Sequence, residues 1–487
     1  MNRGIALIFV LWLTAILALA VSSMLLTLRM EVRRCALQED SVKAFYLAKS
    51  GLAHALSLLA QDVNGFDSYS EEWAFIDSAQ SGLPEEQGRY IVKVEDESGK
   101  LNLNMASRDE LIRFFGDEEI ADAIIDWRDR DDAQSAYGAE ADWYTSAGLP
   151  YKPRNGPFET LHELLLVRGV SKDTFYGVMK DEGQVSTPAW NHLTVYSSVP
   201  NVMPDGSPLV NLNRASEEEL KSALGDVLTD DEVRAIVRYR SGSQAPQQLQ
   251  RPQEGANQKP LPSEAINQGM NFGNSQAGAT SSRAVIAQPP TPSPEGMATH
   301  GEQQQPQRGS EAQARLFNSL SDLFSVPGLP HDKARRIIDR VTIWDGNARY
   351  GVININTAPF EVLMSIPTMS ESIANDIIAF RQTNGAFESL AQLLDLPSVD
   401  EEAFRRLVDH VSIRTNTFRI ISVGWMSSGA RHVIECIIER LPHSPVEATS
   451  QKLQTESLST GFGQPVAHSG SSQKDTYTFL VRYWRER

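Results

Sequence analysis

The sequence predicts an α+β protein in which a long N-terminal helix packs on an antiparallel sheet and an all-α domain is inserted between the strands of that sheet. Three observations predict this fold. A long apolar run opens the chain, segments with strand-like alternation flank a long middle region, and that middle region carries a helical pattern that repeats.

The first element is an apolar run from Ile5 to Leu28 that holds no charged side chain. A helix of about 24 residues at ~1.5 Å per residue is roughly 36 Å long, enough to cross a ~30 Å hydrocarbon core. Residues 5–28 are therefore predicted to span a membrane. Apolar residues at helical spacing continue the pattern to Asp62, so residues 29–97 are assigned to the rest of the helix and the first strands.

Three interpretations of this start remain open: a cleaved secretory signal peptide, an uncleaved anchor, and a short leader, residues 1–4, that is cut after Gly4 while the helix is retained. The leader pattern favours a body outside the cytoplasm. The positive-inside rule favours the opposite, because one arginine precedes the run and Arg29, Arg33 and Arg34 follow it.

Composition excludes several functions. The net charge of −17 disfavours phosphate-mediated nucleic-acid binding and adhesion to an anionic bilayer. No catalytic motif is present: the chain lacks a Gly-x-Ser-x-Gly elbow, a His-Glu-x-x-His pair, a P-loop and a Cys-x-x-Cys, so we expect no enzyme. Two cysteines, Cys35 and Cys436, make no disulfide framework, and whether they pair stays open.

Strands are predicted at both ends of the body, at residues 89–95, 417–423, 431–439 and 477–484. Ser427-Ser428-Gly429 predicts a hairpin turn between two of them. Residues 416–487 are therefore expected to complete the sheet, interrupted by a flexible loop at residues 442–474 that is poor in large apolar side chains.

Three copies of one pattern lie within residues 98–415, which we assign to the inserted helical domain. Each copy opens on an apolar-Asn-apolar-Asn tetrad, followed at fixed offsets by an alanine and a leucine and then, after an apolar pair, by an arginine. The tetrads are residues 101–104, 210–213 and 353–356, and the arginines are Arg128, Arg240 and Arg381. A leucine-rich second half follows, and in the middle copy it reappears only after residues 241–315, which are predicted to be a disordered insertion within that copy.

The last asparagine of each tetrad, Asn104, Asn213 and Asn356, is predicted to cap the helix that follows. Short helices joined by tight turns favour a helix-hairpin-helix or sterile-alpha-motif-like arrangement. Such units often hold DNA phosphates through a Gly-x-Gly hairpin, but the second glycine is missing here, and Pro330 has no N–H to donate. DNA binding is therefore the disfavoured alternative.

An acidic segment follows the second helix of the first copy. Clustered carboxylates suit a hard cation such as calcium, but a solvated loop paired with Arg128 and Arg130 is an equally open interpretation. The candidate ligands are Asp126, Asp129, Asp131, Asp132, Glu140 and Asp142. No other cofactor is expected.

Taken together, these motifs resemble the K-type minor pseudopilins of bacterial type II secretion over nearly the whole chain. The motifs that carry the resemblance are Arg3-Gly4, Ala48-x-Ser50-Gly51, residues 100–104, residues 125–132 with Gly138 and Glu140, residues 164–170 and residues 353–356. The two segments predicted to be disordered depart from the family pattern.

The resemblance implies that a prepilin peptidase cuts after Gly4 and methylates the new N-terminus at Ile5. Most pilins carry a glutamate at the fifth mature position, where this chain has Phe9. The resemblance further implies a non-enzymatic subunit at the tip of a pseudopilus, anchored in the inner membrane with its body in the periplasm. Its implied partners are the I-type and J-type minor pseudopilins, other pseudopilins, and exported substrates or the secretin. The runner-up is a membrane-anchored helix-hairpin-helix protein of DNA uptake.

Overall fold

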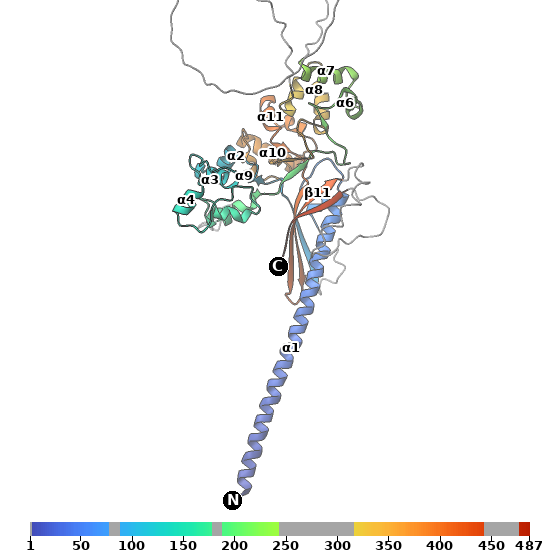
Figure 1. The fold of residues 1–487 in the computed structure, drawn as a ribbon. Coiled ribbons are helices and arrows are strands. Elements are labelled where there is room, and N and C mark those ends of the chain that lie inside the picture. Colours follow the sequence, from blue (N-terminus) through green and yellow to red (C-terminus); the bar gives the residue numbers. More distant parts are fainter. Residues whose placement is uncertain (1, 77–87, 178–187, 243–315, 443–476) are drawn as a thin grey trace, which may run out of the picture.

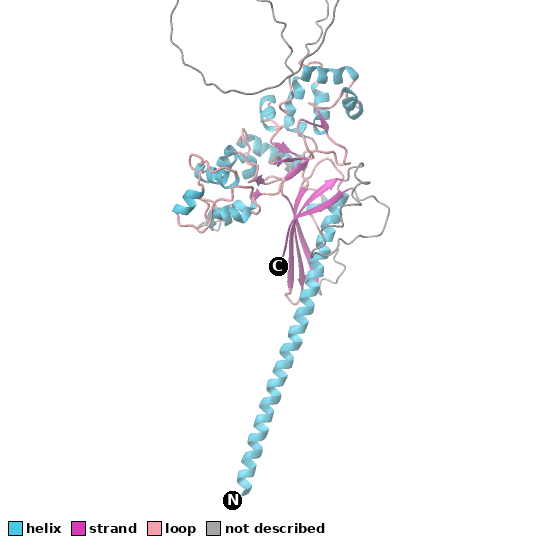
Figure 2. Cartoon of the chain, viewed as in Figure 1, coloured by secondary structure: helices cyan, strands magenta, loops and turns pink. Residues whose placement is uncertain are grey.

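A computed structural model describes residues 2–76, 88–177, 188–242, 316–442 and 477–487 (Figure 1). It shows a long helix α1 (Asn2–Gln61), an antiparallel sheet beside the second half of that helix, and a helical head at the end away from the N-terminus (Figures 1 and 2). The fold is the predicted α+β arrangement. We call α1 the stem, and the described residues between the first and second strands of the sheet the head.

The stem contains 60 residues and is therefore roughly 90 Å long at ~1.5 Å per residue. Every side chain from Leu7 to Glu39 is exposed, whereas those of Ala44, Leu47 and Ala48 are buried against the sheet. The predicted end of the helix near Asp62 is confirmed. The stem thus divides into a free apolar half and a packed half.

Four antiparallel strands form the sheet, in the order β1-β10-β11-β12. They are β1 (Gly88–Asp96), β10 (Thr417–Met426), β11 (Arg431–Pro442) and β12 (Tyr477–Glu486), so all four predicted strands are confirmed. The predicted hairpin turn joins β10 to β11, where Gly429 takes a φ of 90°. β1 and β10 are neighbours in the sheet although the whole head lies between them in the sequence, so the head is an insertion between two neighbouring strands.

Small residues let the stem approach the sheet closely. A Cβ on Gly424 would lie 1.8 Å from the carbonyl oxygen of Ala44, and one on Gly51 would lie 2.4 Å from Ser422 Oγ. The Ser422 hydroxyl donates to the carbonyl of Ala48 at 2.7 Å. The Ala48-x-Ser50-Gly51 motif therefore marks the helix–sheet contact, where any larger side chain would push the stem away.

Apolar side chains of β10 and β11 fill the space under the stem together with Leu59 and with Trp73 of the short helix η1 (Glu72–Ala74). Cys436 is part of this core, and its burial raises the pKa of its thiol to about 12. Cys35 is exposed on the stem. Both thiols are free, so the two cysteines form no disulfide bridge in this structure.

Three copies of one unit build the head: residues 101–194, 210–342 and 353–412. Each copy runs strand, helix, helix, 3₁₀ helix, helix, strand. The first copy contains β2 (Leu101–Asn102), α2 (Arg108–Phe115), α3 (Glu118–Arg128), α4 (Ala141–Ser146), η3 (Leu161–Leu166), α5 (Lys172–Tyr176), η4 (Ala189–Asn191) and β3 (Leu193–Thr194). Among the described residues, the additional α4 belongs to this copy alone, whereas a second 3₁₀ helix before the closing strand occurs in the first and second copies.

The second copy contains β5 (Val210–Asn211), α6 (Glu217–Leu224), α7 (Asp230–Ser241), η5 (Leu320–Ser325), α8 (His331–Ile337), η6 (Ile338–Arg340) and β6 (Val341–Thr342). The third contains β8 (Ile353–Asn354), α9 (Phe360–Ser365), α10 (Glu371–Asn384), η7 (Leu390–Asp395), α11 (Glu401–Leu407) and β9 (Val411–Ser412). Between the copies, β4 (Ser198–Pro200) pairs with β7 (Ala348–Tyr350).

In every copy the first and last strands form a parallel pair of two residues each, β2 with β3, β5 with β6, and β8 with β9. The closing strands were not predicted from the sequence. Because they bring both ends of a copy together, each copy is a closed unit that can follow another along the chain, and one hydrophobic core runs through all three.

The repeated arginines each hold the turn that opens their copy. Arg128 donates to the carbonyls of Leu103 and Ala106, and Arg381 donates to those of Ile355 and Ala358 at 2.9 and 2.8 Å. Arg240 does the same to Leu212 at 3.0 Å. A guanidinium with several donors satisfies carbonyls that no strand or helix uses, which explains why every copy carries such an arginine.

The prediction that Asn104, Asn213 and Asn356 cap helices is wrong. Ser107 and Ser216, each three residues later, cap α2 and α6 in capping boxes with Glu110 and Glu219, and Pro359 precedes α9 without a side-chain cap. The asparagines lie too far upstream to reach the first turn of the helix. Each of them instead binds the backbone of a distant phenylalanine in the same copy.

This asparagine clamp uses both ends of the amide. In the third copy, Asn356 Oδ1 accepts from the N–H of Phe387 at 2.7 Å, and Nδ2 donates to the carbonyl of Phe387 at 2.9 Å. Asn104 binds Phe158 and Asn213 binds Phe317 in the same way. The clamp therefore joins the first half of each copy to the second.

The predicted insertion and loop lie outside the described residues, except for Ser241 and Gly242 of the first and Pro442 of the second. The two ends of the insertion meet within one unit, since the rings of Tyr239 and Phe317 lie 4.9 Å apart. The interruption therefore falls inside the second copy, as predicted, and α7 and η5 belong to a single packed unit.

Candidate functional site

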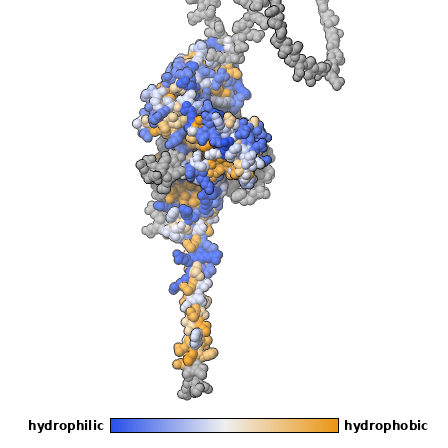
Figure 3. Space-filling model, turned by 90° about the vertical axis from the view of Figure 1, so that its left-hand side faces the viewer, coloured by the Kyte–Doolittle hydropathy of each residue, from blue (hydrophilic) through white to orange (hydrophobic). Residues whose placement is uncertain are grey.

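The exposed half of the stem is the first candidate site. Leu7–Gln61 passes the length and hydropathy criteria for a membrane span, with a mean hydropathy of 2.4 in its most apolar window, none of which is buried. Figure 3 shows these hydrophobic residues gathered along the end of the stem away from the head. An exposed helix of this kind costs far more in water than in a bilayer, so the geometry fits a membrane anchor.

The predicted leader residues lie at the start of α1. Gly4 and Ile5 are both helical, and the side chain of Phe9 is 75% exposed on the stem. The described part of the stem carries no acidic side chain before Glu31. The apolar surface around Phe9 therefore offers no carboxylate to a neighbouring subunit.

The acidic loop of the first copy brings together three of the six predicted ligands. Carboxylate oxygens of Asp129, Asp131 and Glu140 lie within 4.8 Å of one another. Both oxygens of Glu140 and Oδ1 of Asp129 are buried and have no hydrogen-bond partner. Buried acceptors without a donor are costly, and a cation would satisfy them.

Electrostatics point the same way. Burial, followed by the charges of Asp126 and Asp129, raises the pKa of Glu140 to about 7. Burial and the charge of Asp131 also raise the pKa of Asp129. Repulsion among carboxylates is what a divalent cation relieves, so these residues fit a calcium ion chemically.

The other three predicted ligands have different roles. Asp126 is fully buried and accepts from the N–H of Ser135, and Gly138 lies so close to it that a Cβ there would be 2.0 Å from Asp126 Oδ2. Asp132 accepts from Asn155 at 3.0 Å, and Asp142 is exposed in the first turn of α4. Asp126 therefore shapes the loop through the backbone.

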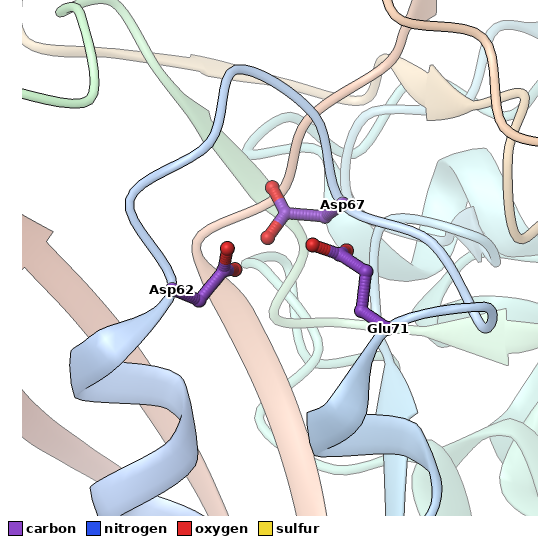
Figure 4. A group of neighbouring side chains, drawn as sticks. All are labelled: Asp62, Asp67 and Glu71. Atoms are coloured by element: carbon purple, nitrogen blue, oxygen red, sulfur yellow. The ribbon is translucent and has the colours of Figure 1, made fainter.

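A second acidic cluster, Asp62, Asp67 and Glu71, was not predicted. It lies where the stem ends and the chain turns toward the sheet, and its three side chains point toward one another (Figure 4). Arg440 of β11 donates to Asp62 at 2.7 Å and to Asp67 at 2.5 Å, and Glu71 accepts from Asn64, Ser68 and Trp73. Because an arginine already supplies the positive charge, this cluster is a structural junction between stem and sheet.

These features define a class of protein. A membrane-length helix that emerges from the packing helix of an antiparallel sheet is the pilin-like design, and the repeated helical head is added to it as an insertion.

Comparison with known proteins supports a particular relationship within that class. Residues 99–179 match the family described as "Type II secretion system (T2SS), protein K", and residues 349–412 match the family described as "Helix-hairpin-helix motif". The chain is 28% identical over 198 residues to Type II secretion system protein K of Aeromonas hydrophila, a match that covers 34% of this chain and 59% of that protein. The resemblance to the K-type pseudopilins and the helix-hairpin-helix character of the head are confirmed.

Two further similarities are weaker. ComE operon protein 1 of Bacillus subtilis is 24% identical over 110 residues, which cover 22% of this chain and 54% of that protein. The chain thus spans somewhat over half the length of these curated relatives. A chain in the crystal structure of the GspK-GspI-GspJ complex from enterotoxigenic Escherichia coli aligns over 93% of this chain and 99% of that one, with 12% identity and a TM-score of 0.42.

Proposed function

We propose that this protein is a non-enzymatic minor pseudopilin that occupies the tip of a type II secretion pseudopilus and starts its assembly. The observation that carries this proposal is the position of the head. It lies at the end of the stem opposite the N-terminus and spreads well to one side of the stem axis (Figure 1). A subunit stacked above would have to occupy the volume of the head, whereas subunits below meet only the stem and sheet.

The start of the stem supports the same position. By resemblance to the family, a prepilin peptidase removes residues 1–4 and methylates Ile5, which leaves the anchor in the inner membrane and the body in the periplasm. Phe9 then stands where most pilins carry a glutamate that pairs with the N-terminal amine of a neighbour. A phenylalanine cannot accept that amine, so this subunit does not need a neighbour stacked above it.

By the same resemblance, the partners are the I-type and J-type minor pseudopilins. They would pack along the exposed face of α1 that the sheet leaves open, which carries Leu37, Val42 and Tyr46 at 47%, 55% and 62% exposure. Exposed apolar side chains on a helix beyond the membrane segment are suited to helix–helix contact. Other pseudopilins below, and exported proteins or the secretin above, complete the proposed environment.

We also propose that the acidic loop binds calcium through Asp129, Asp131 and Glu140. Support comes from the orphaned buried oxygens and the raised pKa of Glu140. The ion would fix the loop between α3 and α4, and with it the position of α4 on the first copy. Its role would be structural.

The alternative function is DNA uptake, and we propose that this protein does not bind DNA. Two basic side chains of the second copy are already paired, Arg335 with Asp395 at 2.6 Å and Arg340 with Asp226 at 2.8 Å. A gel-shift assay of the purified protein with duplex DNA at low salt is expected to show no complex, and a salt-dependent complex would favour the alternative.

The tip position is tested by locating the protein in assembled pseudopili. A gold-labelled antibody against the head is expected to mark one end of each filament, and N-terminal sequencing is expected to begin at Ile5. Phe9→Glu tests the role of the stem, since a restored carboxylate is expected to allow incorporation within the shaft. Wild-type label distributed along filaments would overturn the proposal.

A further inference from the structure

A cleft of about 690 Å³ separates the sheet from the first copy of the head. Its floor is the face of the sheet turned away from the stem, because Ile421, Val433 and Glu435 alternate with residues that pack under α1. Its other wall comes from η3, α5, η4 and the segment after β3. The cleft lies outside both acidic clusters and is not used by the function proposed above.

Aromatic rings line the wall formed by the head. Trp190 and Tyr176 remain 42% and 49% exposed while they line the cleft. Exposed aromatic side chains in a concave site are characteristic of recognition surfaces, because they bury a large area at a small cost in side-chain entropy.

Cations line the floor. Lys93, Arg419, Arg485 and Arg487 border the cleft against two carboxylates, and those carboxylates are already paired. Glu435 binds Arg419 at 2.7 Å and Glu95 binds Lys100 at 2.9 Å and Lys93 at 2.6 Å. Arg487 approaches Glu435 at 3.8 Å, and among the residues that the structure describes Arg485 forms no ion pair. In a chain of net charge −17 this cleft is a local positive site.

The edge of the sheet adjoins the cleft. β12 contributes Tyr483, Arg485 and Arg487 to the floor, and it is the last strand of the sheet in the described part of the chain. One row of its backbone N–H and C=O groups therefore faces away from β11. An extended polypeptide pairs with such an edge, whereas a small anion does not.

Buried contacts hold the two walls in place. Thr194 of the head donates to Glu97, whose carboxylate also accepts from Lys100 at 2.7 Å and from Arg419 of β10 at 2.9 Å. Glu97 is fully buried. The cleft is thus already formed before any ligand arrives, which lowers the entropic cost of binding.

We propose that this cleft binds an extended acidic segment of a partner protein, which pairs with the edge of β12 and places its carboxylates near Arg485 and Arg487 and an apolar side chain between Tyr176 and Trp190. This proposal rests on the proposed function only for the source of the segment, which would be a protein that contacts the tip of the pseudopilus. The recognition itself depends on charge, aromatic contact and a free strand edge.

The experiment uses the full chain in detergent micelles and a fluorescein-labelled decapeptide of alternating aspartate and leucine, read out by fluorescence anisotropy at low salt. A peptide with lysine in place of aspartate and one with alternate backbone N-methyl groups are the controls. We expect the acidic peptide to bind, and both controls to bind at least tenfold more weakly.

Protein variants locate the site. Arg485→Glu and Trp190→Ala are each expected to weaken the acidic peptide at least tenfold, whereas Arg406→Glu, the same charge change on α11 and outside the cleft, leaves binding within twofold. Melting curves confirm that each variant is folded. Equal binding of acidic and basic peptides, equal losses in Arg485→Glu and Arg406→Glu, or no binding would overturn the proposal. Filament labelling tests the tip position separately, so either idea can fail alone.

Discussion

The asparagine clamp makes a quantitative prediction, because its geometry is the same in all three copies while its burial is not. Asn356 is 5% exposed, whereas Asn104 and Asn213 are half-buried. Changing Asn356 to alanine removes the acceptor for the N–H of Phe387 and the donor for its carbonyl, and Phe387 is fully buried. Little water can replace the lost partners in the third copy.

The magnitude follows from the two bonds. A buried polar group left without a partner costs about 1 to 3 kcal/mol, so two such groups cost about 2 to 6 kcal/mol. Partial relaxation of the backbone brings the expected loss to about 2 to 4 kcal/mol, within the upper range of single substitutions. Asn213→Ala is expected to cost about 1 to 2 kcal/mol, because water can reach its half-buried site.

Hydrogen exchange read by mass spectrometry measures the loss of stability locally, around Phe387. The measurement therefore does not require the whole protein to unfold in one step. A loss of about 2 to 4 kcal/mol corresponds to roughly 30-fold to 1000-fold faster exchange in peptides that contain Phe387. Asn384→Ala is the matched control, since Asn384 is exposed at the end of α10. Exchange in Asn356→Ala that matches this control would refute the assignment of the clamp.

Three further predictions concern the turn, the junction and the acidic loop. Thr368 takes a φ of 70°, which a β-branched residue adopts only under strain. Thr368→Gly is therefore expected to raise the free energy of unfolding of the third copy by about 0.5 to 1 kcal/mol in urea titrations. A decrease in that free energy would contradict the prediction. Burial raises the pKa of Glu71 to about 7 from 4.5, so the stability it gives is complete below pH 4.5 and is lost as the pH rises through 7. The melting temperature should therefore fall between about pH 5 and 8, and Glu71→Gln should flatten that fall; unchanged slopes would count against it. Millimolar calcium is expected to raise the melting temperature of the wild-type protein but not of Glu140→Gln, with magnesium as the ionic control, and equal shifts in both proteins would exclude the site.

The sequence could predict the stem, the strands of the sheet and the helices of the head, because each has a periodicity that spans many residues. The closing strands of the head have only two residues each and show no periodicity. A signal was nevertheless present, since Leu193-Thr194-Val195, Val341-Thr342-Ile343 and Val411-Ser412-Ile413 share one pattern. This shared pattern marks the end of each copy.

Long-range side-chain roles were harder to predict. Asparagine before a helix is commonly a cap, and local spacing favours that role over a bond to a residue 31 to 104 positions away. The Asp62–Asp67–Glu71 cluster was missed for the same reason, because the arginine that neutralises it lies 378 positions from Asp62. In the acidic loop, composition identified the right segment, but only the fold separates Asp129, Asp131 and Glu140 from their neighbours.

One geometric rule operates at two scales in this chain. The head leaves the sheet after β1 and returns at β10, where Asp96 and Phe418 are paired partners, so its two ends lie side by side. The insertion in the second copy likewise leaves after α7 and returns before η5, where Tyr239 and Phe317 are in contact. An added segment whose ends are adjacent closes no strained loop. Its entropic cost to the host fold grows only slowly with the length of the segment. A pilin-like stem can therefore carry a head many times larger than its own sheet while the helix–sheet contact through Gly51 and Gly424 stays unchanged. This is the physical condition for a subunit that contacts a filament below through its stem and sheet and presents a different surface, the head, above.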